Sequence, residues 1–124
     1  NVMFVDDDEF ILRTGTAILN KLKYTPICFN SGTEAIRAFK DNHNEIDVII
    51  LDLTMPGMDG LATFRELKKI QPDVKVILTS GYSEQEATRH FEDSGLAAFI
   101  KKPYLMSQLQ QTLRSVLSGS APEN

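Results

Sequence analysis

Short runs of apolar residues recur along the chain and alternate with longer segments of mixed character. Most of these runs are continuously apolar and rich in β-branched residues, whereas a strand with one face in water alternates apolar and polar positions. Continuous runs of this length are typical of strands in a parallel sheet that is covered on both faces. The pattern therefore predicts five strands, at 1–5 (NVMFV), 26–29 (PICF), 47–51 (DVIIL), 74–79 (VKVILT) and 96–100 (LAAFI).

The segments between the strands show helical spacing, with apolar residues three or four positions apart. The segment 84–94 offers little beyond Ala87 and Phe91, so we expect it to be the least firmly packed helix. The other helical segments have clear apolar faces: Ile11, Ile18 and Leu22; Ala35, Ile36 and Phe39; Leu61, Phe64 and Leu67; and Leu105, Leu109, Leu113 and Val116.

Strict alternation of strands and helices predicts one α/β domain over residues 1–118, a doubly wound (βα)5 unit with a five-stranded parallel sheet. Residues 119–124 are expected to form a disordered tail or a linker stub. Because the chain begins with Asn1 rather than Met, a segment cut from a longer protein is one expectation. Local signals support the helix starts: capping boxes at Ser31 with Glu34 and at Ser83 with Glu86, and turn composition at 56–60 (PGMDG).

Composition narrows the range of functions. The chain has 124 residues, a net charge of −4 and a pI near 5.1, which disfavours direct nucleic-acid binding because that needs clustered Lys and Arg. No apolar run approaches the roughly 18 residues that span a bilayer, and the amino terminus lacks a signal-peptide pattern. We expect no membrane contact by this segment and a cytoplasmic location, with a membrane anchor elsewhere in a parent protein left open. The single Cys28 is expected to be a small buried hydrophobe in a reducing compartment rather than a reactive thiol.

Polar residues follow four of the five predicted strands. In doubly wound sheets, ligands bind outside the carboxyl ends of the strands, so side chains at these ends are expected to converge. Three carboxylates at one edge suit Mg²⁺, which takes one or two protein carboxylates and leaves room for water and phosphate oxygens. The residues at these ends are Asp6 and Asp7 after the first strand, Asp52 after the third, Thr79, Ser80 and Gly81 after the fourth, and Lys101, Lys102 and Pro103 after the fifth.

The same residues indicate a reaction. With a metal ion bound, Asp52 can act as a nucleophile, since carboxylates are known to form aspartyl-phosphate intermediates. Lys102 and Ser80 can stabilise negative charge on the transferring phosphoryl group. The new dianionic group then attracts the hydroxyl and the ammonium, so that a small reaction becomes a conformational signal.

Other polar residues have plainer interpretations. Asp8 is either a third metal ligand or, as we favour, an anion at a helix start, where the helix macrodipole stabilises it. Lys101 is expected on the surface, because only one of two neighbouring residues in an extended chain points inward. His43 and His90 are interpreted as exposed polar residues rather than as phosphoryl carriers.

Four segments, VDDDE, IILDLTMPGMDG, VILTSGYS and FIKKPY, occur in an order and spacing that resembles the receiver domain of two-component response regulators. The resemblance covers nearly the whole chain and implies a flavodoxin-like strand order, 2-1-3-4-5. It also implies Mg²⁺ as cofactor and, as phosphodonor, a phosphohistidine on a histidine kinase or a histidine phosphotransfer domain. The site residues that it implies are Asp52 as phospho-acceptor; Asp6, Asp7, Asp52 and the backbone carbonyl of Thr54 as metal ligands; Ser80 and Phe99 as switch residues; Lys102 as the catalytic lysine; and a cis peptide between Lys102 and Pro103.

Two positions depart from the commonest pattern of that family. The fourth strand ends in Ser-Gly rather than Thr-Ala, and Phe99 stands where a Tyr is usual, so no phenolic hydroxyl is available there. One expectation is that Phe99 stays permanently buried while Ser80 and the backbone carry the switch. By the resemblance, Thr54 and Tyr82 tune the lifetime of the acyl phosphate. The segments TSGYSEQEA and KPY are more similar to receivers at the C-terminus of hybrid sensor kinases than to receivers that precede DNA-binding domains.

Two other functions deserve comparison. An aspartyl-phosphate phosphohydrolase would also use Asp52, where a D-x-T pattern begins, but such hydrolases usually need a second acid at the position of Thr54. A receiver-like module that never accepts phosphate is disfavoured by the complete set of acceptor, acidic pair, hydroxyl and lysine. A receiver would catalyse its own phosphorylation and dephosphorylation without being a turnover enzyme alone. A weak homodimer is left open.

Overall fold

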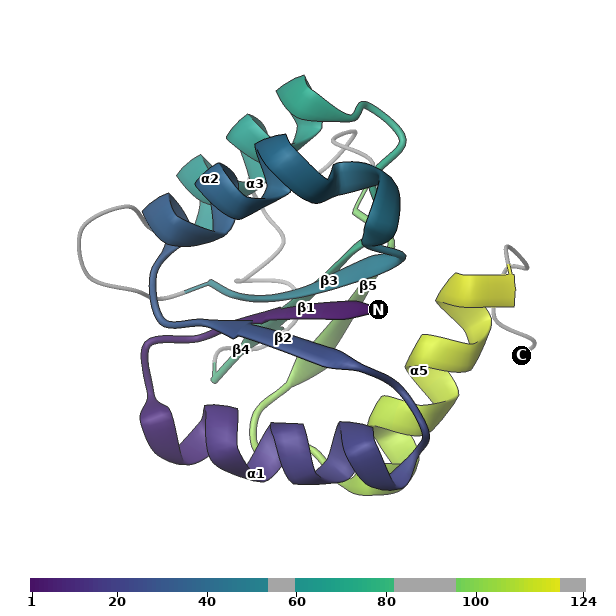
Figure 1. Ribbon diagram of the computed structural model, residues 1–124. Coiled ribbons are helices and arrows are strands. Elements are labelled where there is room, and N and C mark those ends of the chain that lie inside the picture. Colours follow the sequence, from purple (N-terminus) through teal and green to yellow (C-terminus); the bar gives the residue numbers. More distant parts are fainter. Residues whose placement is uncertain (54–59, 82–95, 119–124) are drawn as a thin grey trace.

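The computed structural model describes residues 1–53, 60–81 and 96–118, and it shows a five-stranded parallel sheet between two layers of helices (Figure 1). The strand order is β2-β1-β3-β4-β5, as the family resemblance implied. All five predicted strands are present, although the fourth and fifth begin later than their apolar runs. The strands are β1 (Val2–Val5), β2 (Pro26–Phe29), β3 (Val48–Asp52), β4 (Val76–Ser80) and β5 (Ala98–Lys101).

Helices cover both faces of the sheet, with α2 and α3 on one face and α1 and α5 on the other (Figure 1). Their bounds are α1 (Glu9–Lys21), α2 (Gly32–Asn42), α3 (Gly60–Ile70) and α5 (Met106–Ser118), and a short 3-10 turn spans His43–Glu45. Several expectations lie outside the described residues: the helix at 84–94 with its capping box at Ser83 and Glu86, most of the turn at 56–60, His90 and the tail at 119–124.

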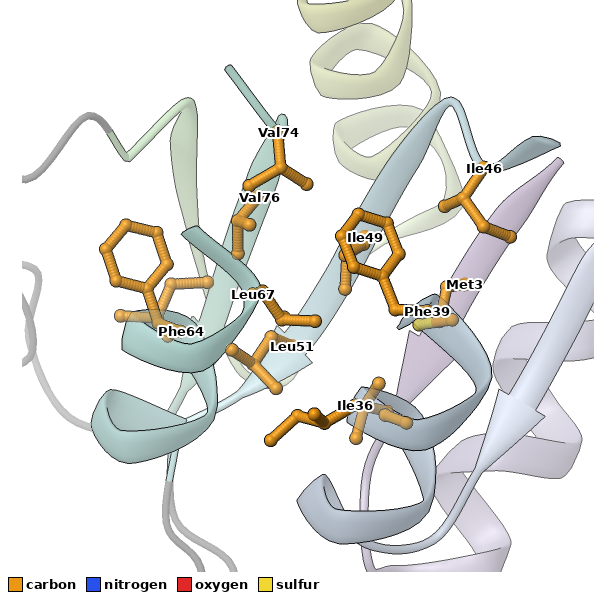
Figure 2. Close-up of a cluster of buried hydrophobic side chains, with 13 residues drawn as sticks. Met3, Ile36, Phe39, Ile46, Ile49, Leu51, Phe64, Leu67, Val74 and Val76 are labelled. Atoms are coloured by element: carbon orange, nitrogen blue, oxygen red, sulfur yellow. The ribbon is translucent and has the colours of Figure 1, made fainter. Parts of the chain in front are cut away.

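Strands with helices on both faces of the sheet contribute side chains to two separate hydrophobic clusters, because successive residues of a strand point to opposite faces. The α2/α3-side cluster, shown in Figure 2, gathers side chains of α2 and α3 with those of β1, β3 and β4. Its buried members are Met3, Val5, Ala35, Ile36, Phe39, Ile46, Ile49, Leu51, Phe64, Leu67, Val74, Val76 and Leu78. The α1/α5-side cluster consists of Val2, Phe4, Leu19, Val48, Ile50, Ile77, Ile100, Leu109, Leu113 and Val116. The continuously apolar runs are therefore explained by burial on both faces.

The buried face of α1 differs from the predicted one. Leu19 is fully buried, whereas Ile11 and Ile18 are only partly buried at the margin of the α1/α5-side cluster. Leu22 is not part of the helix and forms its C-terminal cap. The helix is thus rotated so that Gly15, which the apolar pattern did not mark, faces the sheet.

Replacing Gly15 by alanine is expected to destabilise the domain. A Cβ at this position would overlap the ring of Phe4, which is itself 1% exposed and has no room to move. Overpacking of this kind costs about 1–3 kcal/mol, more than the gain of about 1 kcal/mol in helix propensity from Gly to Ala. The two contributions together should lower the free energy of unfolding, measured in urea, by up to about 2 kcal/mol. Gly81→Ala is the matched control, because nothing lies within 4 Å of a Cβ there; equal losses in the two variants would contradict the packing argument.

Three expectations about single side chains are wrong. Cys28 is exposed rather than buried, because β2 lies at the edge of the sheet and has a neighbouring strand on one side only. His43 is partly buried, since its ring packs edge-on against Phe39 one helical turn earlier, with ring centroids 5.9 Å apart. Leu105 is 68% exposed, because α5 begins one residue later and its buried face does not extend to this position.

Candidate functional site

Three aspartates lie at the carboxyl ends of two neighbouring strands. Asp6 follows β1 and Asp52 ends β3, and the residues before them, Val5 and Leu51, are paired in the sheet. Asp6 and Asp52 are 0% and 3% exposed, whereas Asp7 is open to solvent. Carboxylate oxygens from Asp6, Asp7 and Asp52 all lie within 4.8 Å of one another. These oxygens are close enough to share one cation.

Lys102 joins the two buried aspartates. Its Nζ donates to Asp6 Oδ2 at 2.8 Å and to Asp52 Oδ1 at 2.9 Å, and its side chain is only 18% exposed. Burial alone would lower the pKa of Lys102, but the hydrogen bonds and negative charges of Asp6 and Asp52 outweigh it and raise the pKa above its ordinary value. The ammonium therefore stays charged across the physiological range.

The charges of this group do not balance. Asp6, Asp7 and Asp52 contribute three negative charges and Lys102 one positive charge, which leaves an excess of two negative charges. Carboxylates held this close repel one another strongly in a partly buried site. A divalent cation with a preference for oxygen ligands would balance both the charge and the donor set. The residues present therefore fit a magnesium ion.

Asp8 has a separate role from the other aspartates. Its Oδ1 accepts hydrogen bonds from the backbone N–H groups of Phe10 at 2.9 Å and Ile11 at 3.4 Å, so it caps α1. This confirms the helix-start interpretation. Its own N–H donates to Asp6 Oδ1 at 2.9 Å, which fixes one oxygen of that buried carboxylate. Ser31 caps α2 in the same way, accepting from the N–H of Glu34 at 3.3 Å.

The ends of β4 and β5 bring a hydroxyl residue beside the lysine. Ser80 ends β4 and is 1% exposed, and its carbonyl accepts from the N–H of Lys102 at 2.7 Å. The peptide between Lys102 and Pro103 is cis, which confirms that implication of the family resemblance. Lys101 is exposed, as expected for the neighbour of an inward-pointing lysine.

Other predicted site residues are less central or are not described. Phe99 on β5 is only partly buried and packs against the α2/α3-side cluster, so full burial of this ring is not observed. Thr54 and Tyr82 lie outside the part of the chain that the structure describes.

Two further hydroxyl residues lie beside the site: Thr79, which the sequence places at the end of the fourth strand without assigning it a chemical role, and Tyr104, which the sequence analysis does not single out. Thr79 is 1% exposed and pairs with Asp52 across β3 and β4. Tyr104 follows the cis proline, and burial together with the negative charges of Asp6 and Asp52 raises the pKa of its hydroxyl to about 12. The only sequence signal for them was position, directly beside Ser80 and two residues after Lys102.

Comparisons with known proteins agree with this arrangement. A sequence model described as the response regulator receiver domain matches residues 2–114. The sensor kinase CckA of Brucella abortus (strain 2308) is 34% identical over 116 residues, which cover 94% of this chain and 12% of that kinase. The chain thus spans a small part of the length of that relative.

Solved structures share the fold over nearly the whole chain. A response regulator receiver domain protein from Clostridium thermocellum has a TM-score of 0.89 at 28% identity, covering 95% of this chain and 94% of that one. The CheX–CheY–BeF3–Mg complex from Borrelia burgdorferi contains a chain with a TM-score of 0.88 at 29% identity, covering 94% of this chain and 87% of that one. Across residues 1–53, 60–81 and 96–118, no helix combines the length and apolar character needed to cross a membrane.

Proposed function

Because this chain belongs to the family of response regulator receiver domains, we propose that it accepts its phosphoryl group on Asp52. Receiver domains are the phospho-accepting modules of phosphorelay signalling, and this chain is one of them. The observation that carries the assignment of Asp52 is its contact with Lys102 at 2.9 Å, within the group of three carboxylates. A nucleophile, a fixed cation and a set of metal ligands are then available at one edge of the sheet.

We further propose that Asp6, Asp7 and Asp52 hold Mg²⁺ together with the backbone carbonyl of Thr54. The excess of two negative charges and the shared 4.8 Å neighbourhood of the three carboxylates support this assignment. The related complex from Borrelia burgdorferi is named as containing both BeF3 and Mg. A bound Mg²⁺ ion would neutralise charge that develops on the phosphoryl oxygens.

In the proposed reaction, an oxygen of Asp52 attacks the phosphorus of a phosphohistidine on a histidine kinase or a histidine phosphotransfer domain. An O–P bond forms, the P–N bond breaks, and the imidazole nitrogen keeps the electron pair of the broken bond. Lys102 donates to a phosphoryl oxygen the N–H that it gives to Asp52 Oδ1 in the unmodified protein. Ser80 offers its hydroxyl to a second phosphoryl oxygen.

The remaining roles follow from the same proposal. Ser80 and Phe99 act as switch residues, and the partial exposure of Phe99 leaves its ring room to turn. Thr54 and Tyr82 tune the lifetime of the acyl phosphate. A hybrid sensor kinase is the parent protein that we propose, and the match to CckA supports this choice. We propose that the domain itself works in the cytoplasm and does not contact nucleic acid directly.

Acetyl phosphate with Mg²⁺ tests the assignment of Asp52. Intact mass should show one added phosphate that is lost in base, and neither Asp52→Asn nor the wild type in EDTA should gain it. Full modification of Asp52→Asn would transfer the acceptor role to another residue. An unmodified wild type would favour the interaction module, whereas sustained release of phosphate from a phosphomonoester would favour the phosphohydrolase.

A further inference from the structure

Four buried side-chain atoms have no hydrogen-bond partner among the described residues: His43 Nδ1, Gln71 Oε1, Thr79 Oγ1 and Tyr104 Oη. The first two lie at the ends of α2 and α3, away from the site. The other two belong to the residues beside Ser80 and Lys102. Buried polar groups nearly always have a partner, because an unpaired one loses its hydration without compensation. Because two such hydroxyls occur next to one site, a single partner that binds both would account for them.

The sheet topology puts Thr79 on the strand that the side chain of Lys102 must cross. Strand β4 lies between β3 and β5, so the lysine, which follows β5, must cross β4 to reach Asp52 on β3. Thr79 is the β4 residue paired with Asp52. The alternation of side chains along each strand also places these residues on one face of the sheet. Each of them comes two residues after a member of the α1/α5-side cluster: Asp6 after Phe4, Asp52 after Ile50, Thr79 after Ile77 and Lys102 after Ile100.

Tyr104 follows Lys102 by two residues and lies on the same face of the sheet. It packs against the α1/α5-side cluster, and its hydroxyl is buried. The negative charges of Asp6 and Asp52 reach this hydroxyl strongly enough to contribute to its raised pKa. Thr79 and Tyr104 therefore contribute two buried hydroxyls without partners to the face of the sheet from which Lys102 reaches Asp52.

We propose that Thr79 and Tyr104 are positioning residues for Lys102, and that their hydroxyls bind one ordered water molecule beneath the lysine side chain. The water satisfies both hydroxyls and accepts the third N–H of the Lys102 ammonium, whose other two N–H groups go to Asp6 and Asp52. The water would then fix the position of the Lys102 ammonium relative to the carboxylate of Asp52. This inference rests on the proposed function, because it assigns a kinetic role to the position of Lys102 during phosphoryl transfer.

Phosphorylation rates of hydroxyl-deletion variants test the proposal. Thr79→Val and Tyr104→Phe should each slow modification of Asp52 by acetyl phosphate and Mg²⁺ by roughly two- to tenfold, the effect of one hydrogen bond. Thr79→Ser, which keeps the hydroxyl, should recover most of the rate. The double variant should be little slower than either single variant, because both deletions remove the same water. Tyr24→Phe is the control, since Tyr24 packs against the same cluster at the opposite edge of the sheet.

The outcomes separate this inference from the proposed function. An unmodified wild type would overturn the function, whereas wild-type rates in Thr79→Val and Tyr104→Phe would overturn the positioning role alone. A rate for Thr79→Ser as low as that for Thr79→Val would mean that packing, not the hydroxyl, matters. A high-resolution crystal structure of the unmodified protein should show the water about 2.7–3.0 Å from both hydroxyl oxygens, and a dry contact there would also contradict the proposal.

Discussion

Lys102→Met is expected to lower both the stability of the domain and the rate at which Asp52 is phosphorylated. The substitution keeps most of the apolar stem but removes the ammonium that lies between Asp6 and Asp52. Two buried carboxylates are then left facing each other without a compensating charge. Removing one partner of a buried ion pair typically costs 3–5 kcal/mol, and because the lysine is partly exposed we expect about 3 kcal/mol in the absence of Mg²⁺.

Magnesium should reverse much of this loss of stability. A divalent cation can replace the missing charge, and its binding to the folded state alone adds to the free energy of unfolding. The rate of phosphorylation should nevertheless stay low, on the order of 100-fold below wild type, because a fixed donor to the phosphoryl oxygens is gone. The measurements are urea unfolding with EDTA or with saturating Mg²⁺, and acetyl phosphate kinetics followed by mass.

Lys101→Met provides the matched control for Lys102→Met. It removes the same charge from the neighbouring residue, whose side chain is exposed and has no ion pair within the described residues. Both its stability and its rate should stay close to wild type, since exposed single charges contribute little. If the two variants lost the same stability, the loss would reflect the net charge of the domain and not the contacts of Lys102.

The strands and the convergence of the site could be predicted from the sequence, because both depend on simple periodicities. A run such as VIIL reads as a covered parallel strand, and the residue after it must lie at the carboxyl edge of the sheet. Asp52 and Asp6 were found in this way. Their approach follows from strand order, which the family resemblance supplied.

Contacts that depend on rotation or register could not be predicted. The apolar pattern does not give the phase of α1, because Gly15 carries no hydrophobic signal although a Cβ there would overlap the ring of Phe4. The exposure of Cys28 depends on β2 being an edge strand, which the residues of β2 do not reveal. The pairing of Thr79 with Asp52 depends on the register between β3 and β4 as well as on the order of the strands.

The three aspartates at positions 6–8 have two different functions, which the number of negative charges alone does not distinguish. Asp6 and Asp7 contribute oxygens to the group of three carboxylates, whereas Asp8 uses its carboxylate to cap α1. Asp7 differs from Asp6 in being exposed, so its charge has little influence on the packing of the core. Mutation of Asp7 and Asp8 can therefore distinguish metal binding from folding.

Asp7→Asn is expected to weaken Mg²⁺ binding with little effect on stability. The substitution replaces a charged ligand by a neutral one, and on the scale known for metal-site substitutions the dissociation constant should rise on the order of 10- to 100-fold. Without metal the unfolding free energy should be unchanged or slightly higher, because one repulsion among three close carboxylates is removed. Calorimetric titration with MgCl2 and urea unfolding in EDTA measure the two effects.

Asp8→Asn removes the same charge one residue later and keeps a good helix cap, because Asn and Asp are nearly equivalent at that position. Its Mg²⁺ dissociation constant should therefore rise by less than about threefold, the size of a screened charge effect from outside the ligand group. The test is the ratio between the Mg²⁺ dissociation constants of Asp7→Asn and Asp8→Asn. Equal weakening would mean that the ion responds only to the net charge of the acidic run, and a larger effect at Asp8 would make that residue a ligand at the expense of Asp7.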